Sequence, residues 1–278
     1  MFVFEFNIFT LALRNIMKPF PAHLVTTEKY TVKLAESLRE IQKALRLRFE
    51  VFNLELNEGL SSSTEVGFDS DVFDTFCDHL IVVENSTSTV VGTYRLLRNE
   101  RAEKHIGFYS EGEFDVKKLK SLSGNSLEVG RSCVAKAHRS STVINLLWSG
   151  ISRYVELFDI DRLFGCVSLH TKDPKEISLI TEYIRRNYFS PEQYRVTPLP
   201  QCTMNLPSVD EKTFSLVNVF HRLPPLLKGY LRLGAVVCSE PAYDKDFGTV
   251  DFFILVEKNR ITERYRNHYI QSLETAAA

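Results

Sequence analysis

Residues 127–142 read LEVGRSCVAKAHRSST and combine the features of a buried strand, a short polar loop and the start of a helix. Leu127 to Val134 is a strand candidate, and apolar residues then recur at three- and four-residue spacings along 142–158. A loop that ends in a helix N-terminus presents backbone N–H groups to an anion, and Arg139 lies beside them. The segment therefore predicts a strand–loop–helix unit with a candidate phosphate site.

The flanking sequence contains both predicted helices and predicted strands. A stripe from Leu34 to Phe52 predicts a helix, and residues 174–188 predict another, opened by Asp173-Pro174 as an N-cap and a first-turn proline. Strands are predicted at 79–84, 90–97, 163–169, 193–197 and 250–257. Strands that alternate with helices predict an α/β fold with a mixed central β-sheet flanked by helices.

Composition excludes several classes of protein. The 278 residues are 44% hydrophobic and 25% charged with a net charge of −1, so we expect a globular chain that does not bind nucleic acid. Five cysteines without a CxxC pair argue against a disulfide framework or zinc site and favour a reduced, cytoplasmic setting. We expect no metal.

The two ends of the chain carry weaker signals. No apolar run reaches the roughly 18 residues of a membrane span. Residues 2–17 are apolar, which predicts either an element packed on the body or a shallow contact with a membrane surface. The final residues 275–278 predict a disordered tail.

Glu128 and Arg131 are the first candidates for chemistry. Three positions apart, they would face opposite sides of a regular strand, but a bulge near Gly130 would bring both to one face. A carboxylate there can take a proton from an attacking ammonium group. The alternative is a plain ion pair at the surface.

Several long runs resemble a known enzyme family. CDHL (77–80), VVGTYRLL (90–97), FYSEGEFD (108–115), LEVGRSCV (127–134), LPPLLKGYLRLGA (223–235) and EPAYDKDFGTVDFF (240–253) occur in order. This order resembles the ornithine N-acyltransferases, which are related to the acyl-homoserine-lactone synthases, over roughly residues 28–256. The lactone synthases are shorter and lack the last two runs.

The resemblance implies a GNAT-type acyltransferase fold with a C-terminal extension. It divides the chain into an N-terminal segment (1–27), a GNAT-like core (28–200), an extension packed on the core (201–258) and a tail (259–278). It also implies transfer of a (3-hydroxy)fatty acyl group from acyl carrier protein to the α-amino group of ornithine, the first step of ornithine lipid synthesis. The carrier supplies phosphopantetheine, so no further cofactor is expected.

The chemistry of this reaction suggests roles for individual residues. Glu128 is expected to act as general base, directly or through a water, and a backbone N–H near Arg131 or Ser132 to polarise the thioester carbonyl. The acceptor-binding set is Asp71, Asp74, Asp78, Arg95 and Arg48. The acidic members would hold ammonium groups or, alternatively, form a loop network with Arg48 or Arg95. Arg95 and Arg131 would bind the acceptor carboxylate or brace that loop.

The carrier is expected to bind near the start of the predicted helix at 142–158. The loop there lacks the glycines of acyl-CoA-dependent relatives, which suits the single phosphate of carrier-bound phosphopantetheine. The predicted carrier-binding residues are His138, Arg139, Ser140, Ser141, Thr142 and Arg98. Further candidate contacts with the acidic carrier are Arg101, Lys104, Lys117, Lys118 and Lys120, unless these are only a solvated charged face.

Other interpretations stay open at this stage. The acceptor could be glycine, lysine or tyrosine, or the chain could be a lactone-type signal synthase. In a different class, it could be a non-catalytic module that binds acyl carrier protein or a membrane. Residues 223–234, apolar with two cations, would either pack in the core or touch a bilayer, giving a peripheral inner-membrane contact.

Overall fold

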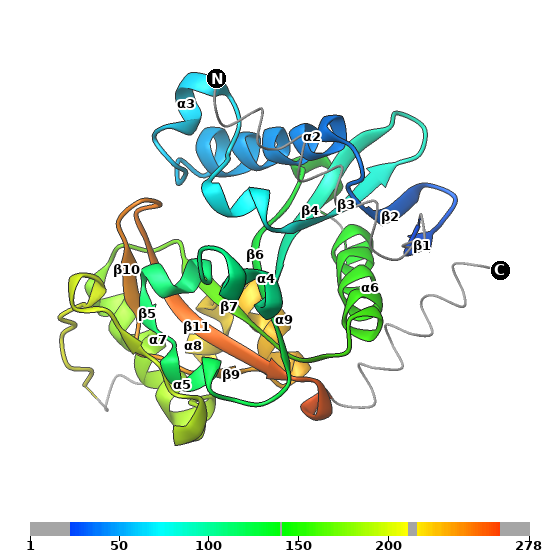
Figure 1. Ribbon diagram of the computed structural model, residues 1–278. Helices are drawn as coiled ribbons and strands as arrows, with labels where there is room; N and C mark the ends of the chain where they lie inside the picture. Colours follow the sequence, from blue (N-terminus) through cyan, green and yellow to red (C-terminus); the bar gives the residue numbers. More distant parts are fainter. Residues whose placement is uncertain (1–22, 140, 211–215, 262–278) are drawn as a thin grey trace. The chain divides into compact units, whose positions relative to one another are not determined.

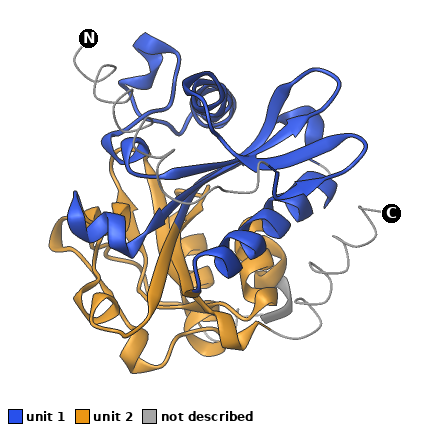
Figure 2. Cartoon of the chain, turned by 45° about the vertical axis from the view of Figure 1, so that its right-hand side comes forward, with its two compact units in different colours: residues 1–106, 129–159, 266–278 blue, residues 107–128, 160–265 orange. Residues whose placement is uncertain are grey.

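The computed structural model describes residues 23–139, 141–210 and 216–261. The chain forms two compact units (Figure 2). Unit 1 comprises residues 1–106, 129–159 and 266–278, and unit 2 comprises 107–128 and 160–265. The strand β6 (Asn125–Val134) belongs to both, with Glu128 as its last residue in unit 2. The segment 127–134 is thus a strand, as the sequence predicts.

Unit 1 is built on four antiparallel strands in chain order: β1 (Val25–Thr26), β2 (Tyr30–Leu34), β3 (Asp78–Glu84) and β4 (Thr89–Arg98). Two helices, α2 (Leu38–Phe49) and α6 (Ser141–Leu157), pack on these strands (Figure 1). The shorter helices are α3 (Ser63–Val66), α4 (Asn99–Lys104), a π-helix at Glu50–Glu55 and 3₁₀ turns at Val72–Thr75 (η2) and Lys136–His138.

Opposite faces of these strands receive the two helices. Ile81 joins the core cluster of α2, whereas its neighbour Leu80 points toward α6. Gly150 of α6 allows this close approach, since a Cβ there would lie 2.7 Å from Val32 and 3.0 Å from Leu80. Helix, sheet and helix therefore form three layers in this unit.

Unit 2 contains the parallel pair. Residues 125–128 of β6 pair in parallel with β7 (Ile160–Leu169), and β7 pairs antiparallel with β11 (Thr249–Glu257). The strands β10 (Ala242–Asp244) and β9 (Val236–Val237) also pair with β11, and β5 (Phe114–Asp115) pairs with β8 (Thr197–Pro198). Its helices are α5 (Lys117–Lys120), α7 (Pro174–Asn187), α8 (Leu216–Arg222) and α9 (Pro225–Leu233), with 3₁₀ turns at Tyr109–Gly112 (η3), Glu192–Tyr194, Pro200–Cys202 and Lys258–Arg260. The mixed sheet is confirmed.

Aromatic side chains fill the core of unit 2. Every residue of β11 is buried, and Phe253 stacks on Phe164 of β7 with ring centroids 5.4 Å apart. Phe114 contacts Phe253 edge-on at 5.7 Å. Residues 249–257 are therefore a central strand of this unit, paired along β7 from Arg162 to Leu169.

Two predicted elements differ from the structure. The helix predicted from Leu34 begins at Leu38, because Leu34 is the last residue of β2 and Ser37 caps the helix by accepting the Glu40 N–H at 3.2 Å. The strand predicted at 193–197 is wrong, since a 3₁₀ turn occupies Glu192–Tyr194 and only Thr197–Pro198 are extended. The N-cap at Asp173 is confirmed, with its side chain accepting the Lys175 N–H at 3.0 Å.

Core packing is confirmed for residues 223–234. Leu227 and Tyr230 of α9 are 0% and 2% exposed. The described residues contain no helix both long and apolar enough to cross a bilayer. The predictions for residues 2–17 and for the tail 275–278 lie outside the described residues.

Candidate active site

The strand β6 changes its backbone conformation at the predicted bulge. Its parallel pairing with β7 ends at Glu128, and Arg131 adopts a φ of +49°, in the left-handed region. A residue with a Cβ pays about 1–3 kcal/mol for a strained conformation of this kind, so the surrounding contacts must hold it. Gly130, Arg131 and Ser132 are partly exposed between buried neighbours.

Main-chain groups fix the carboxylate of Glu128. It accepts the N–H of Tyr109 at 2.8 Å and that of Ser110 at 2.9 Å, from the start of η3. Glu128 is 6% exposed, and the Arg131 side chain is 8% exposed. This burial argues against the solvent-exposed ion pair that the sequence left open.

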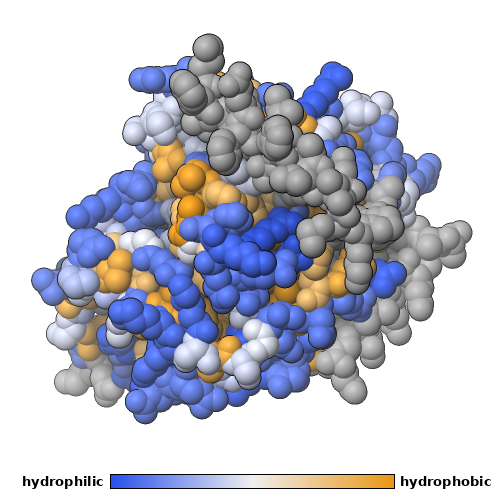
Figure 3. Space-filling model, in the orientation of Figure 1, coloured by the Kyte–Doolittle hydropathy of each residue, from blue (hydrophilic) through white to orange (hydrophobic). Residues whose placement is uncertain are grey.

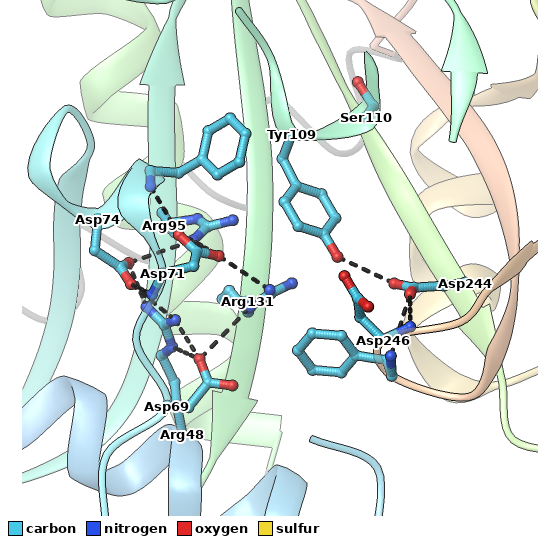
Figure 4. Close-up of polar contacts among 12 residues, drawn as sticks. Arg48, Asp69, Asp71, Asp74, Arg95, Tyr109, Ser110, Arg131, Asp244 and Asp246 are labelled. Carbon is cyan, nitrogen blue, oxygen red and sulfur yellow. Dashed lines mark hydrogen bonds and ion pairs between the residues drawn. The ribbon is translucent and has the colours of Figure 1, made fainter. Parts of the chain in front are cut away.

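Tyr109 also connects η3 to the β10–β11 hairpin. Its hydroxyl donates to Asp244 at 3.0 Å, and Asp244 accepts the N–H groups of Asp246 and Phe247 at 2.8 and 3.1 Å (Figure 4). The sequence interpretation missed Tyr109 and Asp244. The available signal was their position in two of the family-like runs, 108–115 and 240–253.

Acidic and basic side chains alternate in unit 1 (Figure 4). Arg48 of α2 donates to Asp69 at 2.8 Å and to Asp74 at 2.6 Å. Arg95 of β4 donates to both oxygens of Asp71 at 2.7 Å. We call the set Arg48, Asp69, Asp71, Asp74, Arg95 and Arg131 the Arg–Asp network; sequence interpretation missed only Asp69.

The network also fixes the loop before β3. The Asp71 side chain accepts the Phe73 N–H at 2.9 Å, and the Asp74 side chain accepts the Asp71 N–H at 2.9 Å, so the pair forms a capping box on η2 (Val72–Thr75). Arg131 reaches Asp71 at 3.1 Å and Asp69 at 3.6 Å. The acidic loop thus anchors the left-handed residue of β6.

Charges within the network stabilise one another. Burial disfavours the charged form of Asp74, but Arg48 and Arg95 outweigh burial and lower the pKa of that carboxyl well below its usual range. Burial opposes the charge of Arg95 too, yet Asp71 and Asp74 raise its pKa above the ordinary value. Arg48 is 0% exposed and offers no accessible atom to an acceptor. The contacts of Arg48, Arg95, Asp71 and Asp74 are therefore those of the alternative in which these residues form a loop network.

Asp78 belongs to a different group. It accepts the Tyr154 hydroxyl at 2.7 Å and lies 3.2 Å from Arg101. Burial, followed by the charge of Asp78, raises the pKa of Tyr154 well above 10, so this hydroxyl remains a donor. Asp78 is 5% exposed, and its described contacts tie β3 to α6 and α4. The structure therefore does not show Asp78 as part of the Arg–Asp network.

The residues at the start of α6 already have protein partners. Arg139 donates to Glu55 at 2.7 Å and to the Val134 carbonyl at 3.0 Å, and His138 lies 3.0 Å from the Tyr30 hydroxyl. Ser141 and Thr142 are exposed in the first turn of α6, and Ser140 lies outside the described residues. Arg98 stacks over Phe158 at 3.7 Å and pairs with Glu100 at 3.2 Å. Phosphate binding here stays a prediction.

One group of described residues has the atoms of a metal site. The ligand atoms of Glu113, Cys166 and Asp251 lie within 4.8 Å of one another in unit 2. Burial, together with the nearby carboxylates of Glu113 and Asp251, raises the pKa of the Cys166 thiol well above 9. A protonated thiol is a poor metal ligand, so the group by itself does not define a metal centre.

The fold matches known acyltransferases. A sequence profile described as the acetyltransferase (GNAT) domain matches residues 47–149. The solved structure of FeeM, an N-acyl amino acid synthase from uncultured soil microbes, superposes with a TM-score of 0.50 at 8% identity and covers 82% of this chain and 91% of that one. The chain thus has the GNAT-type acyltransferase fold.

Sequence relatives define the family more closely. The L-ornithine N(alpha)-acyltransferase of Brucella abortus is 39% identical over 246 residues, which are 86% of this chain and 88% of the relative. The protein of that name from Rhizobium meliloti is 34% identical over 85% of this chain and 83% of its own length. This chain belongs to the L-ornithine N(alpha)-acyltransferase family.

Proposed function

We propose that this protein transfers a (3-hydroxy)fatty acyl group from acyl carrier protein to the α-amino group of ornithine, the first step of ornithine lipid synthesis. The acceptor is supported by curated relatives named for ornithine and its α-nitrogen, which match 85–88% of the chain. The donor rests on the family-like runs and on the glycine-free loop at 138–142. The enzyme uses no cofactor beyond the phosphopantetheine of its carrier and works in the cytoplasm.

The placement of Glu128 carries the proposal. Two main-chain N–H groups hold its carboxylate in one orientation. Substrate binding therefore does not have to order a mobile side chain, which would cost conformational entropy. It takes a proton from the α-ammonium group, directly or through a water. The amine nitrogen then bonds to the thioester carbon, the C–S bond breaks, and the second nitrogen proton leaves with the phosphopantetheine sulfur.

The backbone of β6 stabilises the carbonyl oxygen of the thioester. Negative charge develops on that oxygen as the amine attacks, and the backbone N–H of Arg131 or Ser132 stabilises this charge. Asp69 and Asp71 fix Arg131 and thereby the direction of these N–H groups. In this mechanism the Arg–Asp network orients the site, and Glu128 moves the proton.

An acyl-transfer assay tests the assignment of donor and acceptor. The purified protein is incubated with 3-hydroxyacyl carrier protein and each common amino acid, and lipid products are identified by mass. A lyso-lipid that forms only with ornithine is the expected result. Products with glycine, lysine or tyrosine would reassign the acceptor within the same reaction class. Carrier binding without any product would contradict the enzymatic proposal and favour a binding module.

The substitution Glu128→Gln tests the base. It keeps an acceptor for one N–H of η3 but cannot take a proton, so the rate should fall by roughly 10²–10⁴-fold while carrier binding persists. Glu103→Gln, at an exposed position of α4, is the matched control and should keep the wild-type rate. An unchanged rate for Glu128→Gln would remove this residue from the mechanism.

A further inference from the structure

The C-terminal helices carry positive charge with no acidic residue among them. Residues 212–239 contain four lysines and arginines and no acidic residue, although the whole chain has a net charge of −1. Three of the four cations lie on α8 and α9: Arg222, Lys228 and Arg232. His221 precedes Arg222 in α8. A surface that carries one sign of charge attracts anionic partners.

Local contacts gather these cations into one surface. Lys228 donates to the His221 carbonyl at 2.8 Å, and Lys228 and Arg232 lie 6.0 and 5.9 Å from the centre of the Phe220 ring. The α8–α9 basic surface comprises His221, Arg222, Lys228 and Arg232.

No described acidic residue neutralises this surface. None of its lysine or arginine side chains forms an ion pair within residues 23–139, 141–210 and 216–261, whereas Arg185 and Arg186 of the adjacent α7 pair with Glu240 and Glu182 at 2.6 and 2.7 Å. His221, Arg222 and Arg232 are exposed. The positive charge of the α8–α9 basic surface therefore faces solvent.

The apolar side of α9 is not available for insertion into lipid. Leu227, Tyr230 and Leu231 are at most 7% exposed because they pack inside unit 2. What remains outside is cationic, with the half-buried ring of Phe220 between Lys228 and Arg232. A face of this kind binds a charged surface through electrostatics rather than by burying apolar area.

We propose that the α8–α9 basic surface docks this protein on an anionic lipid bilayer. Cytoplasmic membrane surfaces carry a negative potential that attracts clustered lysine and arginine side chains. An acyltransferase whose product is an amphiphile gains from working at that surface, because the product can pass directly into the bilayer. The docking follows from the charge distribution and needs neither carrier nor acceptor, so it is measurable separately from acyl transfer.

Vesicle co-sedimentation of the full chain tests the docking. The protein should sediment with phosphatidylglycerol–phosphatidylcholine vesicles at low salt, be released as salt increases, and stay in solution with pure phosphatidylcholine. Each cation removed should weaken binding roughly fivefold, so Arg222→Gln/Lys228→Gln/Arg232→Gln should weaken it on the order of a hundredfold. The thermal midpoint of each variant shows that it is folded.

Two control variants separate this surface from charge in general. Lys29→Gln/Lys172→Gln/Lys175→Gln removes the same charge from exposed positions elsewhere and should bind nearly as the wild type does. Arg222→Lys/Arg232→Lys keeps the charge and should also bind. Equal loss in both triple variants, or no binding of the wild type to anionic vesicles, would overturn the proposal. Loss of carrier binding alone in the α8–α9 variant would assign the surface to an acidic protein instead.

Discussion

The arginines of the Arg–Asp network and those of α8–α9 carry the same charge in opposite settings. Arg48 is 0% exposed between two carboxylates, whereas Arg232 is exposed and has no described ion-pair partner. A buried arginine satisfied by carboxylates fixes local geometry, because removing one partner leaves a charge stranded in the interior. An exposed arginine contributes little to folding and remains available to an external anion. Charge therefore fixes local structure in the first region and remains available for binding an anion in the second.

Substituting Arg48 should have the largest effect on stability. Arg48→Met leaves the buried carboxylates of Asp69 and Asp74 without their shared partner and should cost about 3–5 kcal/mol in the free energy of unfolding. Arg39→Met, on the exposed side of α2, should change it by no more than about 0.5 kcal/mol. Urea denaturation measures both, and equal effects would show that burial does not distinguish the two arginines.

Acid should weaken the network next. Asp74 has a lowered pKa in the folded protein, so its contribution to stability is complete above its ordinary pKa, near 4, and is lost as pH falls below that value. Asp74→Asn should lose less than Arg48→Met, since the amide still accepts one hydrogen bond. The variant should also lose part of the wild type's acid dependence. Unfolding free energies measured between neutral pH and pH 3 check this, and parallel curves for both proteins would contradict it.

Tyr109→Phe should have a smaller effect. It removes one hydrogen bond to the Asp244 carboxylate, while the Asp246 and Phe247 N–H groups remain in place. We expect a loss of about 1–2 kcal/mol in stability. Acyl-transfer kinetics add a second readout, since η3 also presents the Glu128 partners. Tyr243→Phe, on an exposed position of β10, serves as the control. Identical stability for the two variants would remove the Tyr109–Asp244 bond as a structural tie.

Salt should have the smallest effect on the network and a large one on docking. Raising ionic strength shortens the Debye length to a few ångströms, which screens exposed charges far more than buried ones. The stability difference between the wild type and Arg48→Met should change by less than about 0.5 kcal/mol, while vesicle binding is lost. A stability difference that disappears with salt would mean that water reaches the network.

Local sequence determined much of the fold. Helical spacing placed α6 and α7 within one or two residues, and Asp173-Pro174 marked the start of α7. The predicted strand at 193–197 failed because short extended segments depend on a partner, and only Thr197 and Pro198 pair with β5. Leu34 extended the predicted helix because an apolar residue fits the helical stripe and β2 equally well.

The candidate site divides in the same way. The sequence identified Glu128, Arg131 and the acidic loop, because charge is unusual in apolar strands and because the loop is part of the family-like pattern. It missed Asp69, Tyr109 and Asp244, which have partners 19 to 135 residues away in the chain. No local pattern encodes such contacts. The sequence also could not decide whether Asp71 and Asp74 bind the acceptor or brace the loop, since both roles require the same residue types.

By itself, the sequence determined the class of fold, the family and the strand that carries the candidate base, because periodicity, composition and long ordered motifs are local properties of the chain. Only the tertiary structure decided which charges are structural and which are exposed. A side chain's partners and its distance from water depend on segments far apart in sequence, and burial sets the free energy of an unpaired charge. Arg48 and Arg232 look alike in the sequence and differ only once the chain is folded.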